Sequence, residues 1–305
     1  MSSIPAILYK YADLETAEVI IQTKTLRWQS PYELPEPFAV NSAKSLMIKD
    51  DVLTEALAKF VASMIFTHSL PFKDTTNPIV KAIIRWRSTD RFDTEDEAKS
   101  VLTDLLQSTI LKQQEKNQEM LEHWDYYLDH LRILCLGDKP DNLALWQNHA
   151  NNYNGVAFGF EVDPEYDDGA PQKPEKVKYA EQRPVLTDMR AQIEDMLGIR
   201  RLDPKSMFSS QFLVKSKAAV TEQEWRCLRV MPEQQVMMAD VKTHNDFNFD
   251  PENLKRVYLG CNIESEQKIK LMNTIKEQLP KTDIYSCSPN MNQFSLKVEK
   301  IHSGK

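Results

Sequence analysis

Glycine is scarce in this chain of 305 residues, where it occurs seven times against about 7% in an average protein. The sequence contains no GxGxxG motif after a strand and no GxxxxGK[ST] motif. Phosphate-binding loops need glycine because the backbone must approach the ligand closely. A Rossmann or P-loop nucleotide site is therefore not expected. The HExxH and GxSxG motifs of metallopeptidases and serine hydrolases are also missing.

Basic runs, long apolar stretches and paired cysteines are missing as well. The net charge is −7 and lysine and arginine are spread along the chain, which argues against a broad nucleic-acid-binding surface. The longest apolar stretches, such as 61–66, fall far short of the roughly 20 residues that a membrane span needs. Residues 1–6 lack the charged and apolar regions of a signal peptide, so none is expected. The four cysteines are scattered without a CxxC pair: Cys135, Cys227, Cys261 and Cys287. We therefore expect a cytoplasmic protein with reduced thiols and no membrane partner.

Hydrophobic residues make up 41% of the chain, which is enough for a sizeable core. Helical and strand-like periodicities alternate irregularly along it. The expected strands lie at 6–11, 26–29, 133–136, 156–162, 177–179, 222–230, 256–259, 283–287 and 294–301. The expected helices lie at 14–23, 50–68, 78–87, from 94 to 131, 142–152, 185–197 and 265–279. This order predicts a single α+β domain, residues 1–305, with a mixed, mostly antiparallel sheet and a helical insertion at about 45–131.

The insertion carries the clearest local signals. Residues 50–68 place apolar side chains on one helical face. Thr94 and Glu97 form a capping box that starts another helix. Residues 112–119 are wholly polar before the apolar rhythm resumes. This stretch predicts either one long helix with an exposed middle or a helical hairpin.

Glu222, Glu224 and Arg226 are the strongest candidates for chemistry. On a strand these alternate residues share one face. Two neighbouring carboxylates raise the pKa of one of them, whereas the arginine lowers it again. Such a pair suits general acid–base catalysis or stabilisation of a cationic, sugar-like transition state. The alternative is a row of solvent-facing charges on an antiparallel strand.

Two further groups could bind a substrate. Lys10 lies between Tyr9 and Tyr11, so it could hold an anion while a ring stacks on a base; the alternative is an edge strand with an extended lysine. Trp146 and His149 share a helical face, and His149 could transfer protons. The alternative there is a buried tryptophan beside a structural histidine.

Metal sites are not expected. Two loose groups of possible ligands occur, and neither has a recognised ligand spacing. They are His123, Asp125, Asp129 and His130, and Asp240, His244, Asp246 and Asp250.

An ordered set of short motifs resembles a bacterial family of uncharacterised proteins, domain-of-unknown-function family 2971. The matching residues are Leu8 to Tyr11, Ser30-Pro31, Pro37-Phe38, Cys135, Trp146, Gly155, Val177 to Tyr179, Lys215-Ser216, Glu222 to Arg226, and Leu259-Gly260. The resemblance covers nearly the whole chain and includes Lys215 among the expected ligand-binding residues.

The chain departs from the family pattern at three places. Residues 35–39 read Pro-Glu-Pro-Phe-Ala where the family has Asn-Asp-Pro-Phe-Glu. His149 stands where a tyrosine is usual, and Ala219 where a tryptophan is usual. These departures bear on substrate preference and on activity.

The same residues are more distantly similar to ADP-ribosyltransferases. That family has a polar residue on the first strand, Ser or Tyr on the second, and a [Gln/Glu]-x-Glu motif late in the fold. The counterparts here would be Lys10, Ser30 and residues 222–224, although the first-strand residue is usually Arg or His. The family binds NAD without a glycine-rich loop, which agrees with the composition.

This similarity implies roles for the candidate residues. Glu224 would hydrogen-bond the ribose and stabilise an oxocarbenium-like transition state as nicotinamide leaves, and Glu222 would orient or deprotonate the acceptor. Trp146, Tyr9 or Tyr11 would stack on the nicotinamide or the adenine. NAD would then be a substrate, and the acceptor would be a protein or a nucleic acid.

Three functions follow as hypotheses. The first is an NAD-consuming or nucleotide-processing transferase or hydrolase of the toxin or phage-defence type. The second is a non-catalytic module that binds a nucleotide, nucleic acid or protein through Lys10, Lys215 and Arg226. The third is a metal-assisted nuclease. A transferase requires Glu222 and Glu224 at the floor of a cleft near Lys10 and Ser30, whereas a binding module predicts carboxylates that are exposed or fixed by Arg226.

Overall fold

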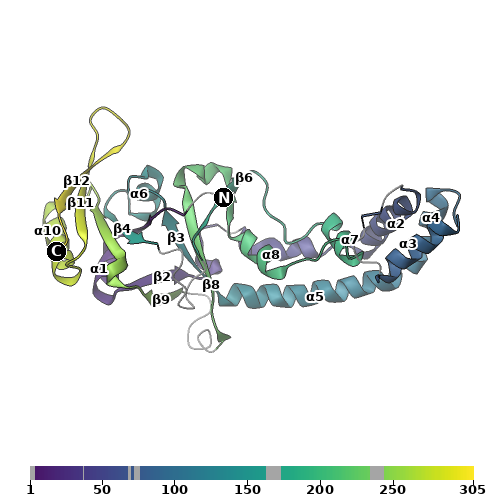
Figure 1. Ribbon diagram of the computed structural model, residues 1–305. Coiled ribbons are helices and arrows are strands. Elements are labelled where there is room, and N and C mark those ends of the chain that lie inside the picture. Colours follow the sequence, from purple (N-terminus) through teal and green to yellow (C-terminus); the bar gives the residue numbers. More distant parts are fainter. Residues whose placement is uncertain (1–3, 37, 68–69, 72–75, 163–172, 234–243) are drawn as a thin grey trace. The chain divides into compact units, whose positions relative to one another are not determined.

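The chain divides into two compact units in the computed structural model, which describes residues 4–36, 38–67, 70–71, 76–162, 173–233 and 244–305 (Figure 1). The first unit comprises Met1–Glu36, Asp129–Arg183 and Leu213–Lys305, and contains the large sheet. The second comprises Pro37–Leu128 and Pro184–Phe212, and is helical. The expected insertion overlaps the first helical segment; the second helical segment was not expected to belong with it.

The large sheet of the first unit is mixed and mostly antiparallel, which confirms the expected α+β class. Its strand order is β12-β11-β10-β4-β1-β3-β2-β9, with β8 beside β3 and β5 beside β8. Only β10 and β11 run parallel among the described pairs of this sheet. The strands are β1 Ile7–Asp13, β2 Thr25–Gln29, β3 Leu131–Gly137, β4 Gly155–Glu161, β5 Glu175–Lys176, β8 Glu224–Val230, β9 His244–Asn248, β10 Leu254–Leu259, β11 Asp283–Pro289 and β12 Leu296–His302. A second, two-stranded sheet pairs β6 (Lys178–Ala180) with β7 (Val214–Ser216).

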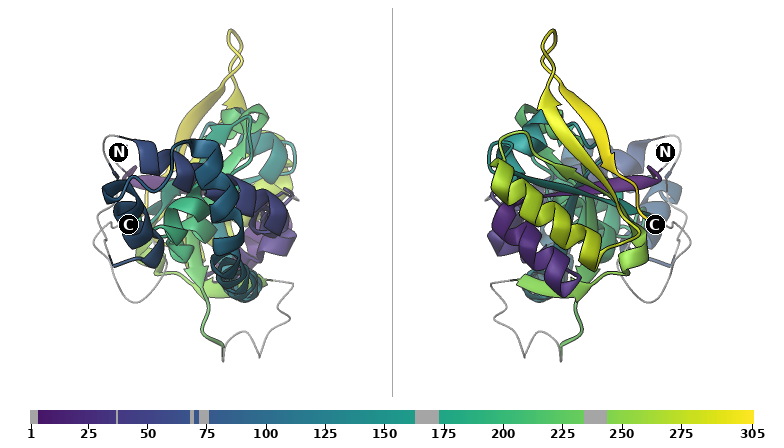
Figure 2. Two further views of the ribbon diagram at one scale, coloured as in Figure 1. Left: turned by 90° about the vertical axis from the view of Figure 1, so that its right-hand side faces the viewer. Right: turned by 90° about the vertical axis from the view of Figure 1, so that its left-hand side faces the viewer.

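Two cores lie on the sheet. Helices α1 (Leu14–Thr23) and α10 (Ser265–Gln278) lie side by side over one face, as Figure 2 shows. A second cluster of buried residues joins β1, β4 and β10 to the short helix α6 (Leu143–His149). Alternation along β1 sends Leu8 into the first core and Tyr9 and Tyr11 into the second, as the two-residue period of a strand requires.

The ladder between β1 and β3 is a single pair, Tyr9 with Gly137. By contrast, β1 pairs with β4 along its whole length, and β3 pairs with β8 along its whole length. The other residues of β1 and β3 are therefore not paired with one another across the two strands. The candidate site lies beside the pair of Tyr9 and Gly137.

The helical unit buries one continuous apolar cluster between its helices. Its helices are α2 Asp50–Phe66, α3 Pro78–Ser88, α4 Glu95–Leu105, the part of α5 (Gln107–His130) up to Leu128, α7 Met189–Met196 and α8 Pro204–Gln211. Thr94 caps α4 by accepting a hydrogen bond from the Glu97 backbone amide at 3.2 Å, which confirms that half of the capping box. Helix α5 is continuous through 112–119, so a hairpin turn in that stretch is wrong. One long helix from 94 to 131 is wrong as well, because α4 ends at Leu105 and α5 begins at Gln107.

Several expected boundaries were wrong. The strand expected at 222–230 begins at Glu224, because Glu222 ends the 3-10 helix η3 (Lys217–Glu222) and Gln223 takes a left-handed conformation with φ 47°. The helix expected at 185–197 begins at Met189, after Asp188 caps it. Strand β9 lies where a loop was expected, and helix α8 was not expected at all.

Candidate functional site

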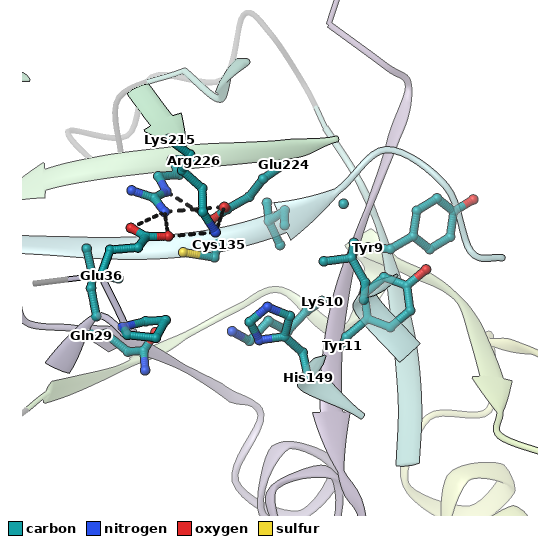
Figure 3. A pocket seen from close by; sticks show the side chains of 15 residues that line it. Tyr9, Lys10, Tyr11, Gln29, Glu36, Cys135, His149, Lys215, Glu224 and Arg226 are labelled. Atoms are coloured by element: carbon teal, nitrogen blue, oxygen red, sulfur yellow. Dashed lines mark hydrogen bonds and ion pairs between the residues drawn. The ribbon is translucent and has the colours of Figure 1, made fainter. Parts of the chain in front are cut away.

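The candidate site is a small cavity in the first unit, drawn in Figure 3. Its volume of about 40 Å³ is room for roughly three water molecules. Lys10 comes from β1, Gln29 from β2, Cys135 from β3, and Glu224 from β8. The full lining is Tyr9, Lys10, Tyr11, Gln29, Leu34, Pro35, Glu36, Cys135, Leu136, Gly137, Leu145, His149, Lys215, Glu224 and Arg226.

The turn before β8 brings its two glutamates to the same lysine. Ser216 caps η3, and the left-handed Gln223 then redirects the chain into the strand. Glu222 and Glu224 therefore do not follow plain strand alternation. Their carboxylates nevertheless both reach Lys215, whose Nζ lies 2.6 Å from Glu222 and 3.0 Å from Glu224.

Arg226 completes a buried ion-pair cluster with these residues. Its Nε lies 2.9 Å from Glu224 Oε1, and its Nη2 lies 3.2 Å from Glu224 Oε2 and 3.0 Å from both oxygens of Glu36. Glu36 also lies 2.6 Å from Lys215 Nζ. The dashed lines in Figure 3 connect these groups. The side chains of Arg226 and Glu224 are 2% and 4% exposed, so solvent screens this pair very little.

The cluster fixes the charge of its members. Burial alone would raise the pKa of Glu224, but Arg226 and Lys215 outweigh burial and lower it to about 2. Burial would lower the pKa of Lys215, but the carboxylates of Glu224, Glu222 and Glu36 outweigh it and raise that pKa. Glu224 is therefore a carboxylate at neutral pH and a poor proton donor or acceptor there.

The Lys10 ammonium lines the cavity without a counter-ion. Among the residues that the structure describes, it has no hydrogen-bond or ion-pair partner. Burial is the main cause of a lowered pKa at Lys10, whereas the nearby Glu224 raises it from beyond ion-pairing distance. Burial without a partner disfavours the charged form of a lysine, and a ligand of opposite charge would stabilise that form.

His149 and Cys135 are both uncharged beside Lys10. His149 is the last residue of α6, and burial and the charge of Lys10 lower its pKa. Burial and Glu224 raise the pKa of the Cys135 thiol to about 12. A thiolate is the reactive form of cysteine, so Cys135 is not poised for nucleophilic attack.

The aromatic candidates belong mainly to the core. The Trp146 side chain is fully buried, donates from Nε1 to the Pro140 carbonyl at 2.8 Å, and lies edge-on to Tyr11. Tyr9 packs edge-on against Tyr258, and the Tyr11 hydroxyl donates to the Lys139 carbonyl. Tyr9 and Tyr11 still line the cavity, whereas Trp146 does not.

The structure thus brings seven of the expected site residues together in the lining of the cavity: Tyr9, Lys10, Tyr11, His149, Lys215, Glu224 and Arg226. Glu222 joins through Lys215 and through Asn148, which donates to it at 3.1 Å. Ser30 does not line the cavity; it is buried, and its hydroxyl accepts from the Tyr32 amide at the start of a 3-10 turn.

Glu36 and Gln29 are site residues that sequence reasoning missed. Glu36 lies within residues 35–39, which depart from the motif described above. That departure was the one feature of the sequence that could have drawn attention to Glu36. Its partner Arg226 lies 190 residues away in the chain, so no local pattern could reveal the pairing. Gln29 directly precedes the expected Ser30 on the second strand.

No metal centre is evident in the described part of the chain, where no group of three His, Cys, Asp or Glu side chains is placed to hold an ion. His244 and Asp246 lie on β9 rather than in the expected loop, and Asp240 falls outside the described residues. None of the described helices is long and apolar enough to cross a membrane.

Comparison with known proteins gives no match: no family model, no curated protein and no solved structure is significantly similar to this chain. The resemblances to the two families therefore rest on the motif residues alone. The functional argument has to come from the site.

Proposed function

We propose that the cavity binds the phosphate of a small nucleotide, with Lys10 as the receiving cation, and that the protein is a non-catalytic nucleotide-binding module. The observation that carries this proposal is the Lys10 side chain, which lines the cavity and has no partner among the described residues. A phosphate oxygen would supply the missing counter-charge and hydrogen bonds. The cavity of about 40 Å³ suits one such group, and the remainder of the ligand would lie outside it.

The fixed carboxylates favour binding over acid–base catalysis. A general acid or base works best with a pKa near the operating pH, whereas the pKa of Glu224 is about 2. Glu222 and Glu224 are both committed to Lys215, and Glu224 is also committed to Arg226. Fixation by Arg226 is the arrangement that the binding-module hypothesis predicts.

A small nucleotide fits the site better than a nucleic acid or a protein does. The unpaired cation lies in a cavity and not on a basic surface, and the chain carries a net charge of −7, so it would repel a polyanion at long range. Tyr9 and Tyr11 give the wall an aromatic surface, and Leu136 and Leu145 add apolar surface. Ligand sites of small molecules commonly combine such apolar walls with a few polar anchors.

Calorimetric titration with AMP and adenosine tests this proposal. AMP is expected to bind at least about thirtyfold more tightly than adenosine, because the contact of a buried charge with its partner is worth roughly 2 kcal/mol or more. Raising the salt concentration should weaken AMP binding only modestly, since the Lys10 contact is shielded from solvent. Equal affinities for AMP and adenosine, or no binding of AMP, would contradict the proposal.

One observation favours a second candidate, an ADP-ribosyltransferase-like or NAD-hydrolysing activity. Lys10 from the first strand and Glu224 from a late strand line one cavity, which agrees with two of the three positions that the resemblance implies. Ser30, the expected residue of the second strand, does not line it. An ionised carboxylate also suits an oxocarbenium-like transition state. However, the contacts of Glu224 with Arg226 and Lys215 already offset its charge.

Measuring the release of nicotinamide from NAD tests the second candidate function. If the protein is such an enzyme, release by the purified protein, with or without cell lysate, should fall at least about a hundredfold in Glu224→Gln, in line with the loss of an electrostatic contact made in a transition state. Glu181→Gln is the matched control, because Glu181 forms an exposed ion pair with Lys217. Our leading proposal expects no release from any of the three proteins.

A further inference from the structure

The Glu36 carboxylate contacts two cations of the same pocket, Arg226 and Lys215. Its two carboxylate oxygens lie 3.0 Å from Arg226 Nη2, and one of them lies 2.6 Å from Lys215 Nζ. An arginine and a lysine that converge on two oxygens are the recognition elements of a phosphate or carboxylate group. Figure 3 shows the Glu36 carboxylate pointing at Arg226 across the cavity from Lys10.

Glu36 is the most exposed of the three carboxylates. Its side chain is 22% exposed, against 10% for Glu222 and 4% for Glu224. It lies outside helices and strands, and it is the last residue of its unit's first segment. Within the described residues, the Leu34 amide bonds weakly to the Pro31 carbonyl at 3.4 Å, Pro35 has no N–H, and no backbone hydrogen bond holds the Glu36 amide.

We propose that Glu36 is an internal surrogate ligand, and that a diphosphate displaces it to reach Arg226 and Lys215 while its other phosphate binds Lys10. This inference rests on the proposed function and specifies its ligand class as nucleoside diphosphates. Withdrawal of Glu36 removes one carboxylate from both Lys215 and Arg226. It also enlarges a cavity of about 40 Å³ that is otherwise too small for two phosphates.

A diphosphate and a monophosphate differ in whether they must compete with Glu36. A monophosphate at Lys10 needs no displacement, because Lys10 has no competing carboxylate among the described residues. A second phosphate must compete with Glu36 for Arg226 and Lys215. Removing the charge of Glu36 should therefore strengthen the binding of ADP and leave the binding of AMP nearly unchanged.

The test is a calorimetric comparison of AMP and ADP on the wild-type protein and on Glu36→Gln. ADP affinity is expected to rise about tenfold in the variant, since the ligand no longer competes with a charge-assisted hydrogen bond. AMP affinity should stay within about twofold, well below the effect of one charged contact. Glu181→Gln, which alters an exposed pair outside the cavity, should change neither affinity.

Hydrogen exchange of the wild-type protein provides a second readout that needs no variant. ADP should increase amide exchange at Leu34, whose amide bonds to the Pro31 carbonyl, because displacement of Glu36 frees this segment, whereas AMP should not. Unchanged or reduced exchange with ADP, or an ADP affinity that is equal or weaker in Glu36→Gln, overturns the inference while AMP binding keeps the proposed function intact. If neither nucleotide binds either protein, both proposals fail.

Discussion

Replacing Arg226 with methionine is expected to lower the free energy of unfolding by about 3–5 kcal/mol, the usual cost of breaking a buried ion pair from one side. The substitution leaves Glu224, which is 3% exposed, and Glu36 without their guanidinium partner. Both carboxylates would then face Lys215 alone. Because water cannot solvate the buried carboxylate of Glu224, the folded state bears the full desolvation cost. Urea denaturation followed by circular dichroism measures the change.

An exposed ion pair provides the matched control for Arg226→Met. Lys217 and Glu181 lie 2.9 Å apart with side chains that are 66% and 77% exposed, so Lys217→Met should cost no more than about 1 kcal/mol. Adding Glu224→Gln to Arg226→Met should recover part of the loss, because it restores the balance of charges in the cluster. A loss for Arg226→Met no larger than that for Lys217→Met would show that the cluster does not stabilise the sheet.

Stability should also fall steeply in acid because of Glu224. Its pKa is about 2 in the folded protein against an ordinary value of 4.5. A lowered folded-state pKa means that the ion pairs stabilise the protein fully above the ordinary pKa. That stabilisation, on the order of 3 kcal/mol, is lost as the pH falls from about 4.5 towards about 2. Lys215 and Arg226 have raised pKa values and stay charged throughout this range.

The pH dependence of Glu224→Gln isolates this effect from the other carboxylates. The variant should be less stable than the wild-type protein at pH 7, and the difference should shrink as the pH approaches 2, because protonated Glu224 resembles glutamine in charge. Urea denaturation at several pH values measures both curves. Parallel curves for the two proteins would mean that Glu224 has an ordinary pKa and is not fixed by Arg226.

The sequence predicted those features of the fold that depend on residues close together in the chain. The apolar faces of α2 and α10 and the hydrogen bond between Thr94 and Glu97 depend on residues within one or two turns. The strand β1 was expected at 6–11 from its run of aromatic and aliphatic residues, and it spans Ile7–Asp13. The mostly antiparallel sheet followed from the irregular order of helices and strands.

The errors have physical causes. The Gln223 backbone adopts a left-handed conformation that is uncommon for residues other than glycine, so Glu222 was wrongly placed on the strand. Strand β9 has a polar sequence that does not indicate a strand. It is a strand because it pairs with β2. Gln113 and Asn117 lie in a wholly polar stretch yet are buried, since Asn117 bonds to the Gln192 side chain 75 residues away.

The sequence predicted several residues of the site but not which of them contact one another. The expected alternation put Glu224 and Arg226 on one face, and the structure joins them by two hydrogen bonds. Nothing local indicated that Glu36 would complete this cluster or that Lys10 would lack a partner. Both facts depend on contacts between segments that are far apart in the chain, and these decide between an acid–base pair and a fixed cluster.

The most direct test of the central claim is the titration of Lys10→Met with AMP. Methionine fills a similar volume without a buried charge, so the variant should be as stable as the wild-type protein or more stable. Its AMP affinity should fall at least about thirtyfold, as expected for loss of the contact with a buried charge, whereas Lys297→Met, at an exposed position on β12, should bind like the wild-type protein. A stable Lys10→Met variant that binds AMP with unchanged affinity would contradict the account, because the partnerless ammonium would then have no part in ligand binding.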